Sequence, residues 1–408
     1  MTQPEARQPG TTSSLLITLA MQSLASAAVI APTVVAAGLL ARMGLPTAAV
    51  GIYVALVYLG AMVASVLGMP IIARHGAIRT SQCALGLCAL GLALVATGLL
   101  PLALAGALVL GLGYGPMTPA SSHILARTTP AHRMGMVFSV KQTGVPLGGV
   151  IAGLVVPALA LGAGAAIALW VVAAAAALCA LPAQTLRASL DVGLSRGNGW
   201  PALDALLQPV RVVWQAPRLR TLALCSFIFS AVQVCLTAYL VSYLTAQLHW
   251  TLVAAGAALS MSQTAGVVGR VLWGWVADNG PGARFTLIGL CGLMMVCGML
   301  MPLFGPPTPT GAVLAVLLVY GATALGWNGV YLAAVARLAG ASQAGMATGG
   351  TLAFTYLGVV ITPPLFGLIA NEWSNFGLAY AIGSVPLGLC LGAMWRAWPR
   401  EKPTFGGA

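Results

Sequence analysis

Charged residues are so sparse along this chain that long uncharged, largely apolar runs dominate its pattern. One membrane-spanning helix needs about 20 apolar residues. Four of the runs exceed forty residues, and each is interrupted near its middle by a short helix-disrupting segment. Four double runs and four single runs therefore predict twelve spanning helices. The runs cover residues 8–41, 43–73, 80–126, 142–186, 221–269, 285–336, 338–371 and 373–395.

The predicted helices fall into two groups of six, separated by the longest polar connection. Within this connection, Pro201 precedes apolar residues at helical spacing from Leu203 to Val210. This segment is either a helix along the membrane surface or a solvated linker. The expected spans are 15–40, 46–72, 80–99, 101–126, 135–160, 164–184, 221–245, 250–275, 284–302, 311–336, 344–369 and 374–395. The expected domains are an N-terminal tail (1–14), an N-terminal bundle (15–184), a central loop (185–220), a C-terminal bundle (221–397) and a C-terminal tail (398–408).

Composition and charge restrict the class of protein. Only 6% of the residues are charged, against about 25% in soluble domains, so a water-soluble fold is excluded. Fifteen of the 18 Lys and Arg residues fall on one side of the twelve-span topology, which predicts that this side, with both termini, is cytoplasmic. The basic residues are spread over short loops, so no nucleic-acid partner is expected. The exceptions are Arg42, in the first external loop, and Lys141 and Arg270, inside predicted spans.

Cysteine spacing and the N-terminal sequence indicate no further chemistry. The eight cysteines lie inside the apolar runs without Cys-x-x-Cys spacing or a nearby His cluster. They are expected to be small core residues rather than metal ligands or disulfides. The first apolar stretch is about twice as long as a signal-peptide core, so it is interpreted as a retained helix. No cofactor or metal is expected.

Similar residues recur in the two groups at an offset of 210. Arg74 matches Arg284, and Gly111 with Arg127 matches Gly321 with Arg337. The segment with Gly135 and Met136 matches the segment with Gly345 and Met346. Several matches at one offset, each at the same place relative to a span, indicate a duplicated six-helix unit. Parallel repeats of this kind are typical of carriers that bind substrate between their halves.

Twelve spans, cytoplasmic termini, a central loop and a six-plus-six duplication resemble the major facilitator superfamily over essentially the whole chain. The resemblance implies an all-α integral membrane fold of two six-helix bundles related by pseudo-two-fold symmetry. It also implies a bacterial transporter that moves a small molecule across the inner membrane as a monomer by alternating access, with protons as one candidate coupling ion.

The loops after the second and eighth predicted helices are similar to the superfamily's gating loops. The first loop keeps Arg74, Gly76 and Arg79, but Ala73 occupies the position of the Asp and Met69 that of the first Gly. The second loop keeps Gly274, Asp278 and Arg284. In the family these loops form a charge-pairing gate, so the implied role of Asp278 is to pair or cap at the cytoplasmic end. The alternative is an ordinary loop carboxylate.

The fifth predicted helix contains a segment similar to the superfamily's antiporter motif, with the proline displaced by one position. Gly144 with Gly148, and Gly149 with Gly153, are small residues four apart, which allow helices to approach closely. Pro146 permits bending. The segment suits a helix that moves against its partner, and plain close packing is the alternative.

The fourth and eighth predicted helices point to different relatives. Ala107 stands where proton-coupled drug exporters have an arginine, which weakens that assignment. In contrast, Gly269–Gly274 around Arg270 is similar to a segment of monocarboxylate and oxalate carriers whose arginine holds the substrate carboxylate. Gly266 occupies the place of the companion carboxylate found in some animal monocarboxylate carriers.

Lys141 and Arg270 need an explanation because a cation inside a span is costly and usually faces a partner or a water-filled pathway. No Asp or Glu occupies a predicted span interior, so both cations are expected to attract an anion, and the planar guanidinium suits a carboxylate. In the alternatives, Lys141 extends to the interface, and Arg270 pairs with Asp278 or caps carbonyls. Other candidate substrate contacts are Gln22, Tyr114, Gln142, Gln233, Gln263, Trp327, Asn328 and Tyr356.

The leading hypothesis from the sequence is a carrier of a small organic anion, a carboxylate, working as a symporter, an antiporter or a facilitator. The alternative is an exporter of hydrophobic or cationic compounds, which the glycines between Gly144 and Gly149 favour. A membrane enzyme is not expected, because the chain lacks His-Glu-x-x-His, Gly-x-Ser-x-Gly and metal-ligand clusters.

Overall fold

The computed structural model describes residues 10–130, 137, 140–191, 203–340 and 344–397. Within these ranges, twelve helical segments are long and apolar enough to cross a membrane. The chain therefore has the all-α, multi-pass architecture that its apolar runs predict. Outside the described residues lie residues 1–9 of the expected N-terminal tail, the whole expected C-terminal tail, residues 192–202 of the expected central loop and most of the repeated segments around Gly135 and Gly345.

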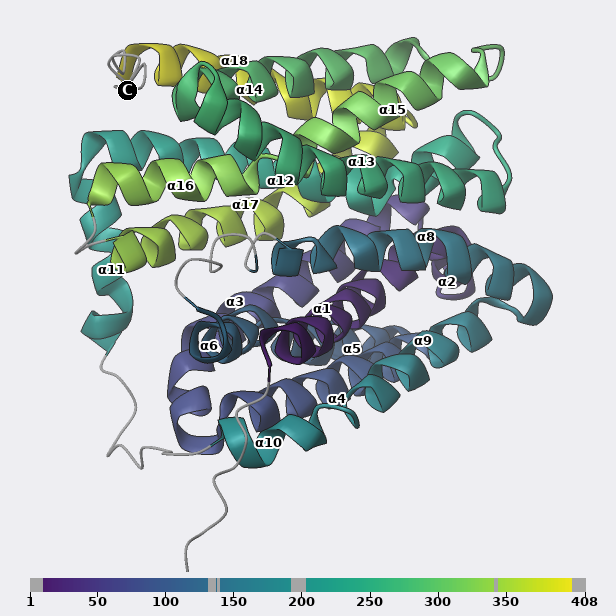
Figure 1. Cartoon of the computed structure of the whole chain (residues 1–408). Helices are drawn as coiled ribbons and strands as arrows, with labels where there is room; N and C mark the ends of the chain where they lie inside the picture. The colour runs from purple at the N-terminus through teal and green to yellow at the C-terminus, as the bar shows by residue number, and fades with distance from the viewer. Residues whose placement is uncertain (1–9, 131–136, 138–139, 192–202, 341–343, 398–408) are drawn as a thin grey trace, which may run out of the picture. The chain divides into compact units, whose positions relative to one another are not determined.

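Two compact units make up the chain, Met1–Pro201 and Ala202–Ala408, called here the N-terminal and the C-terminal unit. Figure 1 labels their helices. The described elements of the N-terminal unit are α1 (Thr11–Val34), α2 (Ala36–Arg42), η1 (Thr47–Ala49), α3 (Val50–His75), α4 (Ala77–Ala96), α5 (Leu100–Tyr114), α6 (Met117–Thr128), α8 (Gly144–Ala163), α9 (Ala165–Cys179) and α10 (Gln184–Leu190). Those of the C-terminal unit are α11 (Leu203–Gln215), α12 (Pro217–Ala246), α13 (Leu252–Asn279), α14 (Gly282–Leu300), η3 (Met301–Leu303), α15 (Thr310–Ala324), α16 (Asn328–Ala339), α17 (Ala344–Glu372) and α18 (Phe376–Ala397).

The same helix pairings recur inside each unit. In the N-terminal unit α1 packs on α8, α3 on α5, and α4 on α9. In the C-terminal unit the corresponding pairs are α12 with α17, α13 with α15, and α14 with α18. The two units thus repeat the same helix pairs, as expected for the duplicated six-helix unit that the offset of 210 residues predicts.

Small residues set the closest of these contacts. A Cβ on Gly111 would lie 1.9 Å from the carbonyl oxygen of Val57, and a Cβ on Gly321 would lie 2.2 Å from that of Ser262. These glycines are at equivalent positions of the repeat. They let α5 touch α3, and α15 touch α13, backbone to backbone. Without a hydrophobic driving force inside lipid, such close packing is a main source of helix association.

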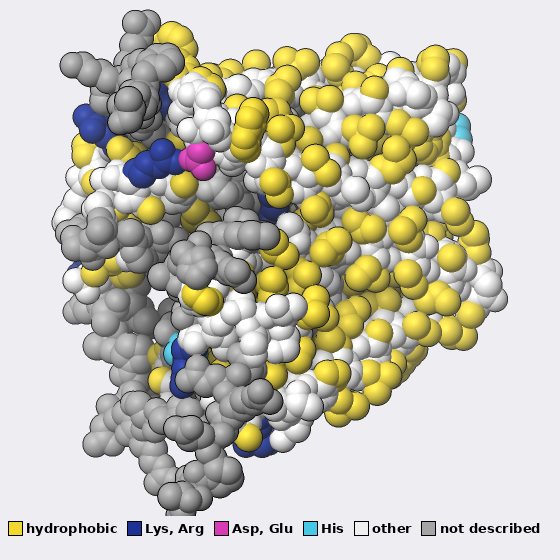
Figure 2. All heavy atoms as spheres, viewed as in Figure 1, with side chains coloured by type: hydrophobic (Ala, Val, Ile, Leu, Met, Phe, Trp, Pro, Cys, Tyr) yellow, Lys and Arg dark blue, Asp and Glu magenta, His cyan; other side chains and the backbone are white. Residues whose placement is uncertain are grey.

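Apolar side chains cover the outer surface of the spans. Leu154, Leu161 and Leu178 are 55%, 68% and 63% exposed, and Figure 2 shows hydrophobic side chains over most of the visible helix surface. This amount of exposed apolar surface is abnormal for a protein in water. In a bilayer it is the surface that contacts lipid.

The fourth span of each unit is broken, which the apolar pattern alone did not predict. The span Leu100–Leu125 contains the end of α5 and the start of α6, with Gly115 and Pro116 between them. The span Thr310–Ala339 contains the break between α15 and α16, at residues 325–327. The two breaks lie 210 residues apart. A broken helix at corresponding positions of two repeats is a known indicator of the binding site in carriers.

The expected central loop is largely helical where it is described. It includes α10, α11 and the first turn of α12, which begins at Pro217. Helix α11 packs on α17: Trp214 stacks on Phe354 with ring centroids 5.9 Å apart, and the Arg220 guanidinium lies 5.6 Å from the Trp214 ring. The described part of this segment is therefore a helix packed on α17, and its position along the membrane surface stays a prediction.

Candidate functional site

A group of polar side chains surrounds the break between α15 and α16 in the C-terminal unit. The Gln233 Oε1 atom of α12 accepts hydrogen bonds from Trp327 Nε1 at 3.0 Å and from Asn328 Nδ2 at 3.2 Å. On α13, Gln263 donates from Nε2 to the Thr237 hydroxyl at 3.3 Å. Gln263 is 1% exposed, and its Oε1 atom has no hydrogen-bond partner among the described residues. The group therefore retains an unused acceptor inside a span.

Arg270 is held at the same break. Its Nε atom donates to the carbonyl of Leu325 at 3.0 Å, and Leu325 is the C-terminal cap of α15. One turn further along α13, Trp273 Nε1 donates to the carbonyl of Ala322 at 2.8 Å. These two donors satisfy carbonyls that the interrupted helix releases, as a broken span in lipid requires. Of the alternatives for Arg270, carbonyl capping is present, whereas the ion-pair partner of Asp278 is Arg337.

The corresponding break in the N-terminal unit has its own polar contacts. The Gln22 Oε1 atom of α1 accepts from the Thr118 hydroxyl at 3.4 Å, and the Ser26 hydroxyl lies 3.5 Å from that of Tyr114. Gln22 is 1% exposed, and its Nε2 atom has no hydrogen-bond partner among the residues that the structure describes. Unsatisfied buried amides at both breaks are unusual, because buried polar groups are nearly always paired.

Lys141 precedes α8 and is 1% exposed. Its ammonium donates to Gln142 Oε1 at 3.4 Å. A lysine that extended to the interface would expose this ammonium, so the burial of Lys141 argues against that alternative. Lys141 belongs to the N-terminal unit and Arg270 to the C-terminal unit. Tyr356, the remaining candidate, lies half-buried on α17.

The glycines of α8 pack against α1. A Cβ on Gly148 would lie 2.4 Å from the carbonyl oxygen of Ser23, and one on Gly144 would lie 3.0 Å from the Gln22 side chain. Pro146 and Gly149 are also buried. Close helix packing therefore accounts for this segment. It is the alternative given above to the antiporter resemblance.

At the turn between α3 and α4, which resembles a gating loop of the superfamily, Asp191 holds the start of α4. Its two carboxylate oxygens accept from the backbone N–H groups of Ile78 and Arg79, each at 3.0 Å. Gly76 has a φ of 88°, and a Cβ there would lie 2.1 Å from the Asp191 carboxyl carbon. Only glycine fits this position, which explains its presence in the motif. Asp191 thus supplies from the end of α10 a carboxylate at the loop where Ala73 replaces the motif's Asp. Arg74 lies half-buried in the last turn of α3.

Substituting Asp191 with Ala is expected to lower the free energy of unfolding by about 1 kcal/mol, the usual cost of losing an N-terminal helix cap. The conservative Asp191→Asn variant keeps one acceptor and should lose less. Melting temperatures of the purified variants in detergent measure both effects. An Asp191→Ala protein as stable as the wild type would show that the cap contributes nothing.

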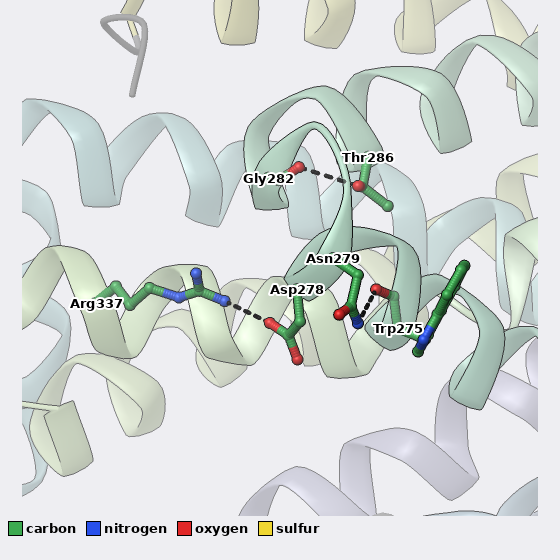
Figure 3. A network of polar contacts seen from close by, with 6 residues as sticks. All are labelled: Trp275, Asp278, Asn279, Gly282, Thr286 and Arg337. Carbon is green, nitrogen blue, oxygen red and sulfur yellow. Dashed lines mark hydrogen bonds and ion pairs between the residues drawn. The ribbon is translucent and has the colours of Figure 1, made fainter. Parts of the chain in front are cut away.

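Asp278, in the last turn of α13, pairs with Arg337 of α16 at 3.3 Å (Figure 3). The other bonds drawn there, from Asn279 to Trp275 and from Thr286 to Gly282, stay within one turn of their own helices. A Cβ added to Gly274 would have no heavy atom within 4 Å, so packing does not require glycine there.

Arg284 lies in the first turn of α14 and contacts α18. It donates from Nη2 to the Trp395 carbonyl at 2.6 Å. Its guanidinium lies 5.2 Å from the Phe285 ring and 5.7 Å from the Trp395 ring. Arg284 is 5% exposed. The described contacts of this arginine are thus within the C-terminal unit.

Neutralising Asp278 is expected to change stability only slightly. The Asp278 and Arg337 side chains are 68% and 50% exposed, and exposed ion pairs contribute about 0.2–1 kcal/mol. A double-mutant cycle with Asp278→Asn and Arg337→Gln measures the coupling from melting temperatures at low and at high salt. Coupling above this range, or coupling that high salt leaves unchanged, would contradict the prediction.

Sequence reasoning missed several polar groups of these clusters. Thr118, Thr237 and Ser26 hydrogen-bond to predicted candidates, and Asp191 caps α4. Threonine and serine are too common in spans to stand out. The Gly115–Pro116 pair was the available signal for Thr118, because it marks the break beside that residue.

Comparisons with known proteins identify relatives of the chain. The family model described as Major Facilitator Superfamily matches residues 15–352. Monocarboxylate transporter 10 of Homo sapiens is 28% identical over 132 residues, which span 29% of this chain and 23% of that protein. The protein of the same name from Rattus norvegicus is 27% identical over 132 residues, with the same shares. The match thus covers less than a quarter of these curated relatives.

Solved structures resemble the chain over nearly its full length. The nucleoside transporter NupG is 16% identical with a TM-score of 0.73, and the match covers 95% of this chain and all (100%) of that one. A D-xylose–proton symporter is 17% identical with a TM-score of 0.72, covering 95% and 98%. A bacterial homologue of the human lysosomal transporter Spinster is 15% identical with a TM-score of 0.73, covering 97% and 98%. At these identities the likeness concerns the fold alone.

Proposed function

The chain belongs to the Major Facilitator Superfamily and is a multi-pass membrane transporter, and we propose that its cargo is a small organic anion with a carboxylate group. The proposal depends on one observation above all: Arg270 lies at the break of the tenth span, positioned by its Nε bond to the Leu325 carbonyl. A guanidinium is a planar group of donors whose geometry matches that of a carboxylate.

The surroundings of Arg270 support this cargo. The same break carries the amides of Gln233 and Asn328 and the indole of Trp327, which can hydrogen-bond a small polar ligand. In the N-terminal unit, the buried Lys141 is a second cation of the same kind. A cation in surroundings of low dielectric favours an anion over a neutral or cationic compound. The partial match to proteins named monocarboxylate transporter 10 agrees with this choice.

The proposed cycle is alternating access by a monomer in the bacterial inner membrane, with both termini cytoplasmic. The domain boundaries remain those proposed from the sequence, with bundles at 15–184 and 221–397. The pair of Asp278 and Arg337 is proposed to belong to a cytoplasmic gate. An exposed pair of modest strength suits a contact that must break and re-form in each cycle.

Close packing of α8 on α1 accounts for the glycines on which the exporter alternative depends. No other contact among the described residues favours hydrophobic or cationic cargo. The exporter is therefore treated as one possible outcome of the thermal-stability experiment that follows.

Thermal stability of the purified protein in detergent tests the cargo class. Small mono- and dicarboxylates, inorganic anions and lipophilic cations are added one at a time, because a ligand that binds only the folded state raises the melting temperature. We expect stabilisation by a subset of carboxylates and uptake of the same compounds into proteoliposomes. Stabilisation by lipophilic cations alone would overturn the anion proposal and favour the exporter.

A further inference from the structure

The N-terminal unit contains an apolar cavity of about 210 Å³ at the end of the bundle opposite Arg74. Six elements contribute to its wall, represented by Pro32 of α1, Leu39 of α2, Ala49 of η1, Tyr53 of α3, Val95 of α4 and Ala103 of α5. The Tyr53 hydroxyl donates to the Val29 carbonyl at 2.9 Å, so the polar atom of this side chain is already bonded. The wall therefore suits an apolar ligand group.

The cavity opens onto an apolar surface. Ile52, Leu100 and Leu104 line it and are also 51%, 38% and 38% exposed. Its volume is below the roughly 300–1,000 Å³ of pockets that enclose a whole drug-sized ligand. A ligand that fits would insert only an apolar end, while its remainder lies along the exposed apolar side chains. A lipid acyl chain has this shape.

A cation stands beside the cavity. Helix α2 supplies Leu39 and Leu40 to the wall and ends at Arg42, which is exposed. Arg42 is the one basic residue that the charge distribution along the sequence places in an external loop. An arginine guanidinium donates paired hydrogen bonds to phosphate oxygens, such as those of a lipid headgroup. We propose that this cavity binds an acyl chain of a phospholipid whose phosphate contacts Arg42.

The transported anion is a poor occupant of this cavity. None of the fourteen lining residues is charged, and the lining is aliphatic apart from Pro32, Tyr53 and Met43. A buried carboxylate without a partner is strongly disfavoured. An acyl chain needs no polar partner, and the headgroup stays outside with Arg42. The proposed lipid site therefore differs in chemistry from the polar clusters at the two helix breaks.

Photo-crosslinking in proteoliposomes tests the proposal on the full-length chain. The probe is phosphatidylglycerol with a diazirine at the end of one acyl chain, and labelled peptides are quantified by mass spectrometry. We expect the label to concentrate on residues 36–53 and 95–104. Ala49→Phe fills the cavity and should reduce this labelling about tenfold, because excluding even two methylenes lowers affinity by that order. Arg42→Gln should reduce it about fivefold.

The matched control is Ala37→Phe, since Ala37 is exposed on α2 and does not line the cavity. It should label like the wild type. Arg42→Gln changes only an exposed side chain, so it tests the proposal even if Ala49→Phe fails to fold. Labelling spread evenly over all exposed apolar surfaces, or unchanged in Arg42→Gln and in a folded Ala49→Phe, would overturn the lipid site. Competition by transported compounds would assign the cavity to cargo and would equally overturn it.

Discussion

Replacing Arg270 with Gln is expected to lower uptake of the transported carboxylate at least about thirtyfold, because removing one partner of a buried, hydrogen-bonded charge pair costs about 2 kcal/mol or more. The same change should abolish the stabilisation of the protein by that carboxylate. Uptake into proteoliposomes and ligand-dependent melting temperatures measure the two effects. Arg270→Lys keeps the charge but loses the two-pronged geometry, so it should retain part of the uptake at a higher KM.

A structural effect of Arg270 must be separated from an effect on binding, since its Nε atom also holds the Leu325 carbonyl. Trp273→Phe is the matched control, because it removes the neighbouring bond to the Ala322 carbonyl in the same contact of α13 with α15 without changing the charge. It should lower the melting temperature while leaving carboxylate binding in place. Equal losses of uptake in Trp273→Phe and Arg270→Gln, or full uptake in folded Arg270→Gln, would contradict the assigned role.

Alanine at Gly111 or Gly321 is expected to destabilise the protein by about 1–3 kcal/mol or more, because a new methyl group in a tightly packed contact forces the backbone to move. At both positions the neighbour is a carbonyl oxygen of the adjacent helix, at 1.9 and 2.2 Å from the added Cβ. A rigid backbone atom, unlike a flexible side chain, has little freedom to shift. Similar losses at the two equivalent positions would also test the duplication physically.

Helical glycines in open positions provide the control for this prediction. Gly86 on α4 and Gly289 on α14 have no heavy atom within 4 Å of an added Cβ. Alanine there should stabilise the helix by about 0.5–1 kcal/mol, because it restricts the unfolded chain. Melting temperatures in detergent compare the four variants. Gly111→Ala or Gly321→Ala variants as stable as Gly86→Ala would contradict the prediction. They would show that the close contacts of α5 with α3 and of α15 with α13 do not contribute to the free energy of unfolding.

Much of the candidate site was predictable because charge is so unusual in a span. Lys141 and Arg270 stand out in any reading of the apolar runs, and Gln22, Gln233 and Gln263 stand out as large amides among aliphatic residues. The duplication was visible at an offset of 210 residues, and both units repeat the same helix pairings. These features depend on composition and spacing, which are the same however the helices pack.

The partners of these residues were not predictable. Arg270 contacts Leu325, which is 55 residues away, and Asp191 caps a helix that begins more than a hundred residues earlier. Asp278 pairs with Arg337 rather than with another basic residue of the same end. Each partner depends on which helices face each other in the folded chain and on the exact positions of the donor and acceptor atoms.

The sequence by itself therefore determined the membrane-spanning class, the twelve spans and the two cations inside them, because transfer of a helix into lipid depends on its summed composition. Only the tertiary structure decided that Arg270 holds the carbonyl at one helix break and that Gly76 makes room for Asp191. Hydrogen bonds and backbone contacts are short-range and directional, so they exist only once distant segments have packed.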